Sequence, residues 1–224
     1  MPGEPSSSVG AVWAILRKEC RSEWRTRYGL SSALLFAVTT LTAVSFVVGK
    51  VGERTDILAA LLWIVLLFAA LASLAHTFVR EVEGHTLTLL RMIASPASIA
   101  LGKLIFNLLF LFVLEAVTVP LFLVLLGGPP PHWGRFLAVL GLGSLALAAA
   151  ATLVGAVIAQ SRGRGALFAA ISLPILLPVV AGAVSGTRGQ WNGVPVDAEL
   201  RLLAAYAAAL LGMSLVLYDH LWED

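Results

Sequence analysis

Charged residues are scarce in this chain: only 12% of its 224 residues are Asp, Glu, Lys or Arg, while 59% are apolar. A soluble domain carries about 25% charged residues, so this chain has too little polar surface to cover a water-soluble globule. The composition also excludes intrinsic disorder and a collagen-like fibre, and a single cysteine, Cys20, excludes an internal disulfide scaffold. With a mean hydropathy of +0.92, the sequence predicts an all-α multispanning membrane protein, and its length accommodates about six spans of roughly 20 residues.

Sequence signatures of catalysis are also missing. No G-x-x-x-x-G-K-[ST] stretch occurs, and no H-E-x-x-H pair is present. The four aspartates, at positions 56, 197, 219 and 224, fall outside the apolar stretches. We therefore predict no catalytic residues, no metal site and no enzymatic activity, and any ATP must be bound by a separate chain. The net charge of +2 is too small and too dispersed to predict a nucleic-acid partner.

The N-terminal segment is basic and amphipathic. After a short leader, Trp13, Leu16, Cys20 and Trp24 recur at helical spacing over residues 9–28. Cations lie among them: Arg17, Lys18, Arg21, Arg25 and Arg27. This pattern is typical of a helix that lies in the membrane interface and contacts lipid. We predict a cytoplasmic leader and interfacial helix over 1–29, a six-span domain over 30–218, and a short cytoplasmic tail over 219–224.

The spans are expected at about 30–48, 57–79, 102–126, 136–160, 166–184 and 200–218. Of the 15 Lys and Arg residues, ten lie on the leader's side of the membrane in this arrangement and five on the other. That excess predicts that both termini are cytoplasmic. Ala151, Gly155 and Ala159 in the fourth span, and Ala208 and Gly212 in the sixth, are spaced by four and predict close helix packing.

Three residues within the predicted spans are unusual. Pro174 and Pro178 remove backbone donors in the fifth span and predict a kinked or broken helix, at a translocation pathway or a dimer seam. Glu115 is ionisable and lies in the middle of the third span. It predicts either a proton or cation contact, or a carboxyl group hydrogen-bonded to a neighbouring helix.

The longest predicted cytoplasmic connection, REVEGHTLTLLR over 80–91, follows the second span. It begins with carboxylates, contains a glycine that can end a helix, and continues as a leucine-rich amphipathic turn. A short helix here can lie across the membrane surface and dock on a cytosolic partner, although an ordinary interfacial loop would show the same pattern. The candidate docking residues are Glu81, Glu83, Gly84, Thr86, Leu89 and Leu90, with Pro96 at the start of the third span.

This loop, with its Ser95-Pro96 and Gly102-Lys103 pairs, resembles the coupling loop of type-2 ABC exporter permeases. The basic leader resembles the elbow helix of those permeases. Six spans with short external loops and a Leu-Pro-x-x-x-Pro fifth span are more specifically similar to the heme exporter B family, the membrane subunit of the cytochrome c maturation transporter. The resemblance implies an inner-membrane permease.

The resemblance also implies partners: a homodimer, two ATP-binding cassette subunits that hydrolyse ATP, and heme-handling membrane proteins of cytochrome c maturation. Heme would be the cargo and not a bound cofactor, and His132, Trp133 and Trp191 are predicted to be interface residues and not heme ligands. The chain could move heme or use ATP to release heme already bound outside. A permease for another lipid, drug or polysaccharide, or a small secondary transporter coupled through Glu115, are the alternatives.

Overall fold

A computed structural model describes residues 8–48, 54–83, 95–127, 130, 132–160 and 164–223 of the chain. These residues form helices and short connections, with no strand among them. The helices are α1 (Ser8–Thr26), α2 (Tyr28–Val48), α3 (Thr55–Glu83), α5 (Pro96–Leu125), α6 (Trp133–Gln160), α7 (Arg164–Trp191) and α8 (Asp197–Glu223). Four of them contain stretches long and apolar enough to cross a membrane, at 28–47, 96–125, 133–155 and 197–217, and α3 begins with a shorter apolar stretch, Thr55–Ala69.

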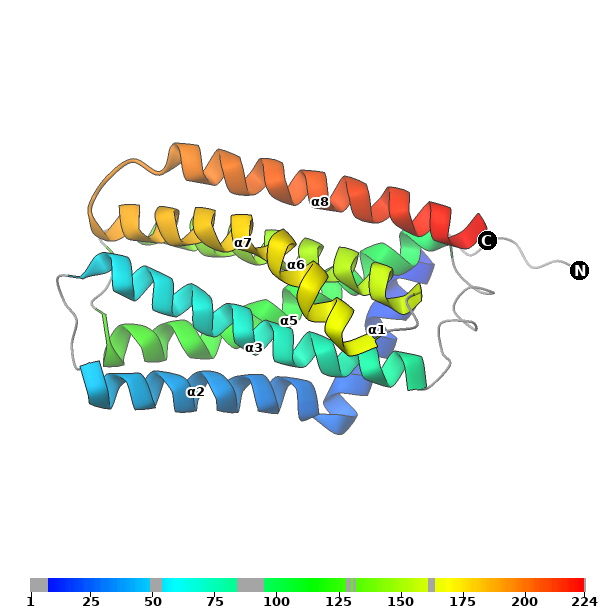
Figure 1. Cartoon of the computed structure of the whole chain (residues 1–224), viewed down its shortest axis with the longest axis horizontal. Coiled ribbons are helices and arrows are strands. Elements are labelled where there is room, and N and C mark those ends of the chain that lie inside the picture. Colours follow the sequence, from blue (N-terminus) through cyan, green and yellow to red (C-terminus); the bar gives the residue numbers. More distant parts are fainter. Residues whose placement is uncertain are drawn as a thin grey trace, which may run out of the picture.

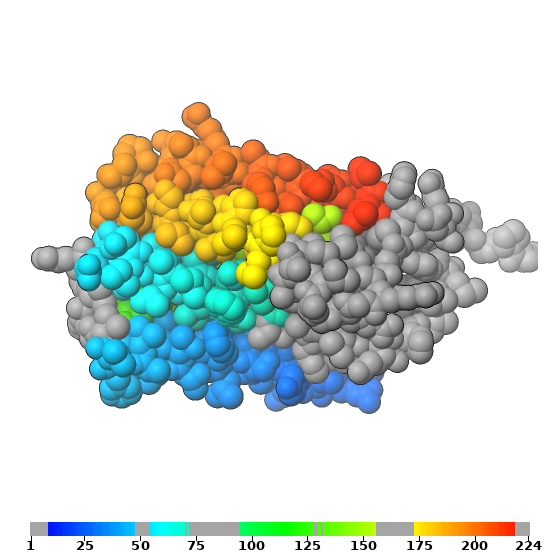
Figure 2. Space-filling view, viewed as in Figure 1, coloured from blue at the N-terminus to red at the C-terminus, as the bar shows by residue number. Residues whose placement is uncertain are grey.

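The helices from α2 onward run up and down alternately in one elongated bundle (Figure 1). The helix α6 packs against α5, α7 and α8, while α2 packs against α3 and α5. The C-terminal end of α8 and the whole of α1 lie at the same end of the bundle (Figure 1). Figure 2 shows α2, α3, α7 and α8 side by side on one face. This arrangement agrees with the all-helical prediction.

One tryptophan fastens three helices at the bundle core. The Trp63 side chain of α3 is fully buried, and its Nε1 donates a hydrogen bond of 2.8 Å to Oγ1 of Thr187 on α7. Its ring covers Gly143 of α6, where an added Cβ would lie 2.2 Å from Cη2 of the indole. A glycine is therefore required at 143 by the close approach of the ring, and not by backbone conformation.

Helix boundaries differ from the predicted spans mainly at two places. The helix α5 begins six residues before the apolar stretch predicted at 102–126, at Pro96, the residue expected to start this span. Ser95 caps the helix: its side chain accepts a hydrogen bond from the Ser98 backbone N–H. The helix α7 continues to Trp191, so the prediction that this helix ends at 184 and leaves 185–191 in a connection is wrong. These residues stay helical because Thr187 and Gln190 face the core, where both are buried.

The small-residue rows have different surroundings. Ala151 and Gly155 of α6 are buried in the bundle, as their spacing predicts. Ala208 and Gly212 of α8 are exposed, because α8 turns Ala207 and Leu210 toward the core instead. The row on α8 therefore does not pack within this chain.

Candidate functional site

A sharp corner joins α1 to α2. The helix α1 ends at Thr26 and α2 begins at Tyr28, with Arg27 between them at φ 53°, in the left-handed region. The Glu23 carboxylate accepts a 2.7 Å hydrogen bond from the Leu30 backbone N–H, which satisfies one of the free donors in the first turn of α2. A backbone reversal and a capping carboxylate together turn α1 across the end of the bundle (Figure 1).

The helix α1 is fastened to α5 by a close crossing. Ile15, Leu16 and Glu19 of α1 are buried against the bundle. At the crossing point, a Cβ added to Gly102 of α5 would lie 2.7 Å from Cγ2 of Ile15 and 3.3 Å from the Val12 carbonyl oxygen. Because Gly102 has no side chain, Ile15 packs directly on the α5 backbone, and this close contact holds α1 against the bundle.

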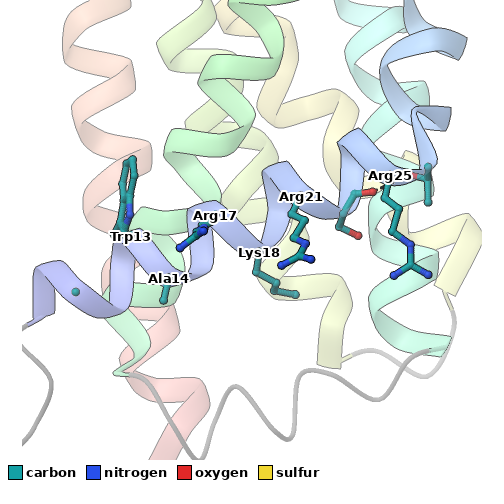
Figure 3. Close-up of a pocket in the computed structure, with 9 residues that line it drawn as sticks. Trp13, Ala14, Arg17, Lys18, Arg21 and Arg25 are labelled. Atoms are coloured by element: carbon teal, nitrogen blue, oxygen red, sulfur yellow. Dashed lines mark hydrogen bonds between the residues drawn. The ribbon is translucent and has the colours of Figure 1, made fainter.

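The outer side of α1 is strongly basic. Four cations line an open groove of about 790 Å³ along it, together with Trp13 and Ala14: Arg17, Lys18, Arg21 and Arg25. In Figure 3 the ring of Trp13 points along the bundle, whereas Lys18 and the guanidinium of Arg25 point to the opposite side of α1. The prediction that this segment is helical is confirmed, but the apolar residues of its predicted stripe do not all face the same surroundings. Leu16 is buried on α5, whereas Trp13 is 65% exposed and Trp24 76% exposed.

The predicted docking loop is described only at its two ends. Glu81 and Glu83 belong to the last turn of α3, and Pro96 is the first residue of α5. Both ends lie at the end of the bundle that α1 crosses (Figure 1). Gly84, Thr86, Leu89 and Leu90 lie outside the described residues, so their role stays a prediction.

A polar seam runs between α5 and α6 inside the bundle. Oγ of the buried Ser144 donates a hydrogen bond to the Glu115 carboxylate, and the Glu115 side chain is only 8% exposed. Two turns earlier on α5, the Asn107 amide donates a 3.1 Å hydrogen bond to Oγ1 of Thr152. The alternative of a carboxyl group hydrogen-bonded to a neighbouring helix is therefore what the structure shows for Glu115. Sequence reasoning missed Asn107, Ser144 and Thr152, although the spacing of eight between 107 and 115 places both on one face of α5.

The proline pair lies in a helix that bends but is not broken. The helix α7 is continuous through Pro174 and Pro178, and it changes direction along its length (Figure 1). Both prolines are exposed. Between them, the backbone carbonyl of Ile175 accepts a 3.0 Å hydrogen bond from the Tyr206 hydroxyl of α8. This hydrogen bond ties α8 to α7 between the two prolines, one residue away from the Pro174 carbonyl that loses its helical donor at Pro178.

Aromatic side chains close the opposite end of the bundle. The Trp191 ring packs against Phe122 and Phe136, with ring centroids 6.2 and 5.8 Å away, and Trp133 meets Phe136 edge-on at 6.1 Å. Trp191 therefore packs on the core, and His132 is exposed beside this cluster. Within the described ranges, no group of three or more His, Cys, Asp and Glu side chains is placed to hold a metal ion.

The fold and these features define a multi-pass helical membrane protein with a basic helix across one end. The model of the family described as CcmB protein matches residues 10–217. Curated relatives called heme exporter protein B come from Paracoccus denitrificans (31% identical over 204 residues, 90% of this chain and 93% of the relative) and Rhodobacter capsulatus (28% over 202 residues, 89% and 93%). A third, from Pseudomonas aeruginosa, is 27% identical over 209 residues, 89% of this chain and 91% of the relative.

The chain therefore belongs to the CcmB protein family, and the resemblance seen in the sequence is confirmed. The match covers α1 and nearly all of the bundle, so the family relation concerns the whole architecture and not a single motif.

Proposed function

We propose that this chain is the membrane subunit of an ABC transporter that exports or delivers heme for the maturation of c-type cytochromes. The observation that carries the proposal is the family match, which extends over residues 10–217 and joins the chain to relatives named heme exporter protein B. The chain has no ATP-binding motif of its own, so a separate ATP-binding cassette subunit supplies the energy.

In this proposal α2, α3, α5, α6, α7 and α8 are six spans of the inner membrane, and α1 is an elbow helix in the cytoplasmic interface. The placement of α1 across the end of the bundle supports this, as do its exposed Trp13 and Trp24 and its outward cations (Figure 3). The excess of Lys and Arg at this end orients both termini toward the cytoplasm.

A topology assay tests that orientation. A reporter that is active only in the cytoplasm should work when fused after Asp224, and a reporter that is active only outside should work when inserted at 188–196. The described residues of this second segment lie at the far end of α7 and in the connection to α8. The reverse pattern would contradict both the orientation and the cytoplasmic position of the loop after α3.

The connection between α3 and α5 would couple ATP hydrolysis to the membrane subunit. Its described ends, Glu83 and Ser95, support this role because they lie at the end of the bundle that α1 crosses, the proposed cytoplasmic end (Figure 1). Leu89 and Leu90 would fill a groove of the ATPase, since a few buried apolar anchors usually carry most of an interface's energy. Glu81 and Glu83 would meet basic groups at its rim.

The assembly would contain two copies of this chain, two ATPase subunits and heme-handling membrane proteins on the outer side. The exposed row of Ala208 and Gly212 on α8 is compatible with a homodimer seam, because small residues allow two helices to approach closely. A secondary transporter coupled through Glu115 is the alternative of a different class. The hydrogen bond from Ser144 instead assigns that carboxyl group a partner within the chain.

Deletion of the gene in its source organism tests the proposal. Loss of c-type cytochromes, restored by this chain and not by a variant lacking residues 84–94, is the expected result. The control is a b-type cytochrome, whose heme does not pass through this pathway and whose level should not change. A deletion strain with normal c-type cytochromes and a defect in the export of another compound would contradict the heme assignment while leaving the permease class intact.

A further inference from the structure

A second groove lies under the corner of α1, between α1, α2 and α5. Its volume is about 430 Å³, within the range of about 300–1,000 Å³ that small-molecule sites occupy. The inner part is apolar and is formed by Leu34 of α2 and by Phe106, Leu109, Phe110 and Val113 of α5. From Phe106 to Val113 the helix rises about 10 Å, so the groove runs from the corner well into the apolar part of the bundle.

The mouth of this groove carries a positive charge. The Arg27 guanidinium carbon lies 5.3 Å from the centroid of the Trp24 ring, and both side chains line the groove. Glu23 lies beside them, with one carboxylate oxygen bonded to the Leu30 backbone N–H. In the part of the chain that the structure describes, Arg27 has no carboxylate within ion-pair distance. The Arg27 backbone lies in the left-handed region, which residues other than glycine rarely adopt, and this conformation places the cation at the mouth.

We propose that this groove binds one membrane phospholipid, with an acyl chain along Phe106 to Val113 and the phosphate at Arg27. The charge complementarity is direct, because a planar guanidinium forms paired hydrogen bonds with phosphate oxygens. The depth of the groove fits a chain that descends from the headgroup layer into hydrocarbon. The inference rests on the proposed interfacial position of α1, but it does not depend on what the transporter carries.

The bound lipid would fill the groove between α1, α2 and α5 at the corner. Leu109 and Val113 are 45% and 47% exposed, so an acyl chain would cover apolar surface that the protein leaves open. The lipid would thereby connect α1, which carries the basic surface, to α2 and α5 of the span bundle. Arg27 is the specificity-determining residue of this site.

Native mass spectrometry of the purified full chain in detergent tests the site. The probes are 1-palmitoyl-2-oleoyl-phosphatidylglycerol and the matching diacylglycerol, which has the same acyl chains and no phosphate. One phosphatidylglycerol should bind at least about tenfold more tightly than the diacylglycerol, because only the phosphate can form charge-assisted hydrogen bonds with Arg27.

Matched variants separate the site from general lipid contact. Val113→Trp fills the groove and should abolish the tight binding, whereas Val117→Trp should leave it intact. Val117 lies one turn further on the same helix and is 43% exposed, but it does not line the groove. Arg27→Gln should weaken binding about tenfold, and Arg25→Gln, on the other groove, by less than about twofold. Arg27→Gly removes the cation and relieves the left-handed strain, so it should lose the lipid without losing thermal stability.

Equal binding of phosphatidylglycerol and diacylglycerol would overturn the phosphate assignment. Equal losses in the variants at 113 and 117 would overturn the groove assignment. If Val113→Trp instead converts a dimer to a monomer and leaves lipid binding unchanged, a second copy of the chain occupies the groove and the lipid proposal is wrong. All these measurements use the isolated chain without heme or ATPase, so failure of the proposed transport function would not by itself alter their outcome.

Discussion

Two glycines in α6, two residues apart, should respond in opposite ways to the same added methyl group. Gly143 lies under the indole of Trp63, and a Cβ there would be 2.2 Å from Cη2 and 2.9 Å from two neighbouring ring carbons. An added Cβ at Gly141 meets no atom within 4 Å. The pair isolates the contact with Trp63, because the helix and the chemical change are the same for both variants.

The size of the difference follows from three contributions. Alanine is favoured over glycine in a helix interior by about 1 kcal/mol, and this gain applies at both positions. At 143 the indole must move, and such overpacking costs about 1–3 kcal/mol. Moving the ring also weakens its hydrogen bond to Thr187, worth about 1 kcal/mol. Gly141→Ala should therefore gain up to about 1 kcal/mol, and Gly143→Ala should lose about 1–3 kcal/mol.

Thermal unfolding of both variants in the same detergent, followed by differential scanning calorimetry, measures the difference. The account expects a higher melting temperature for Gly141→Ala than for the wild type, and a lower one for Gly143→Ala. Trp63→Phe combined with Gly143→Ala should recover part of the loss, because the smaller ring leaves room for the methyl group. Equal melting temperatures for the two glycine variants would refute the packing of α3 on α6 at Trp63.

Three further predictions concern the spans and α1. Replacing Pro174 and Pro178 together with leucine should straighten α7 and leave insertion intact but impair cytochrome maturation; unchanged c-type cytochromes would reduce both prolines to packing residues. Ser144→Ala should destabilise the chain by about 1–3 kcal/mol, because it leaves the buried Glu115 carboxyl group without its hydrogen-bond donor. In thermal unfolding, the double variant Ser144→Ala with Glu115→Leu should recover most of that loss. A double variant as unstable as Ser144→Ala alone would contradict this explanation. Cys20 is largely exposed, but partial desolvation, and secondarily the charge of the adjacent Glu19, raises the pKa of its thiol. Iodoacetamide should therefore label the native thiol at half-maximal rate at a higher pH than the denatured chain, and equal midpoints would contradict the shift.

The all-helical architecture could be predicted from the composition, because the lipid environment determines which backbone structures are possible. Apolar runs of about twenty residues form helices in lipid, where no water satisfies the backbone groups. The C-terminal end of α7 could not be predicted from composition. Residues 185–191 look like a loop, because Gly186, Gly189 and Arg188 interrupt the apolar run, but Gly186 and Gly189 are where Val139 and Val196 pack closely on the helix.

The contacts that make up the candidate sites were mostly beyond sequence reasoning. Glu115 was identifiable because a carboxyl group inside a span is unusual, yet its partner Ser144 is one of many small polar residues that could have faced it. The groove at Arg27 depends on a single left-handed residue and on the crossing of three helices. Pairings of this kind are decided by tertiary packing, and the local pattern of the chain does not encode them visibly.

The central proposal is that a separate ATPase docks on the connection between α3 and α5, and co-purification tests it most directly. The chain carrying Leu89→Asp and Leu90→Asp should insert normally but lose the ATPase subunit, because buried apolar anchors become charged. Thr88→Asp, a polar position in the same loop, is the matched control and should retain the ATPase. Reversing the charges of Glu81 and Glu83 should weaken the complex less, and more at low salt than at high salt. A full complement of ATPase on the double leucine variant would show that this connection does not couple the two subunits.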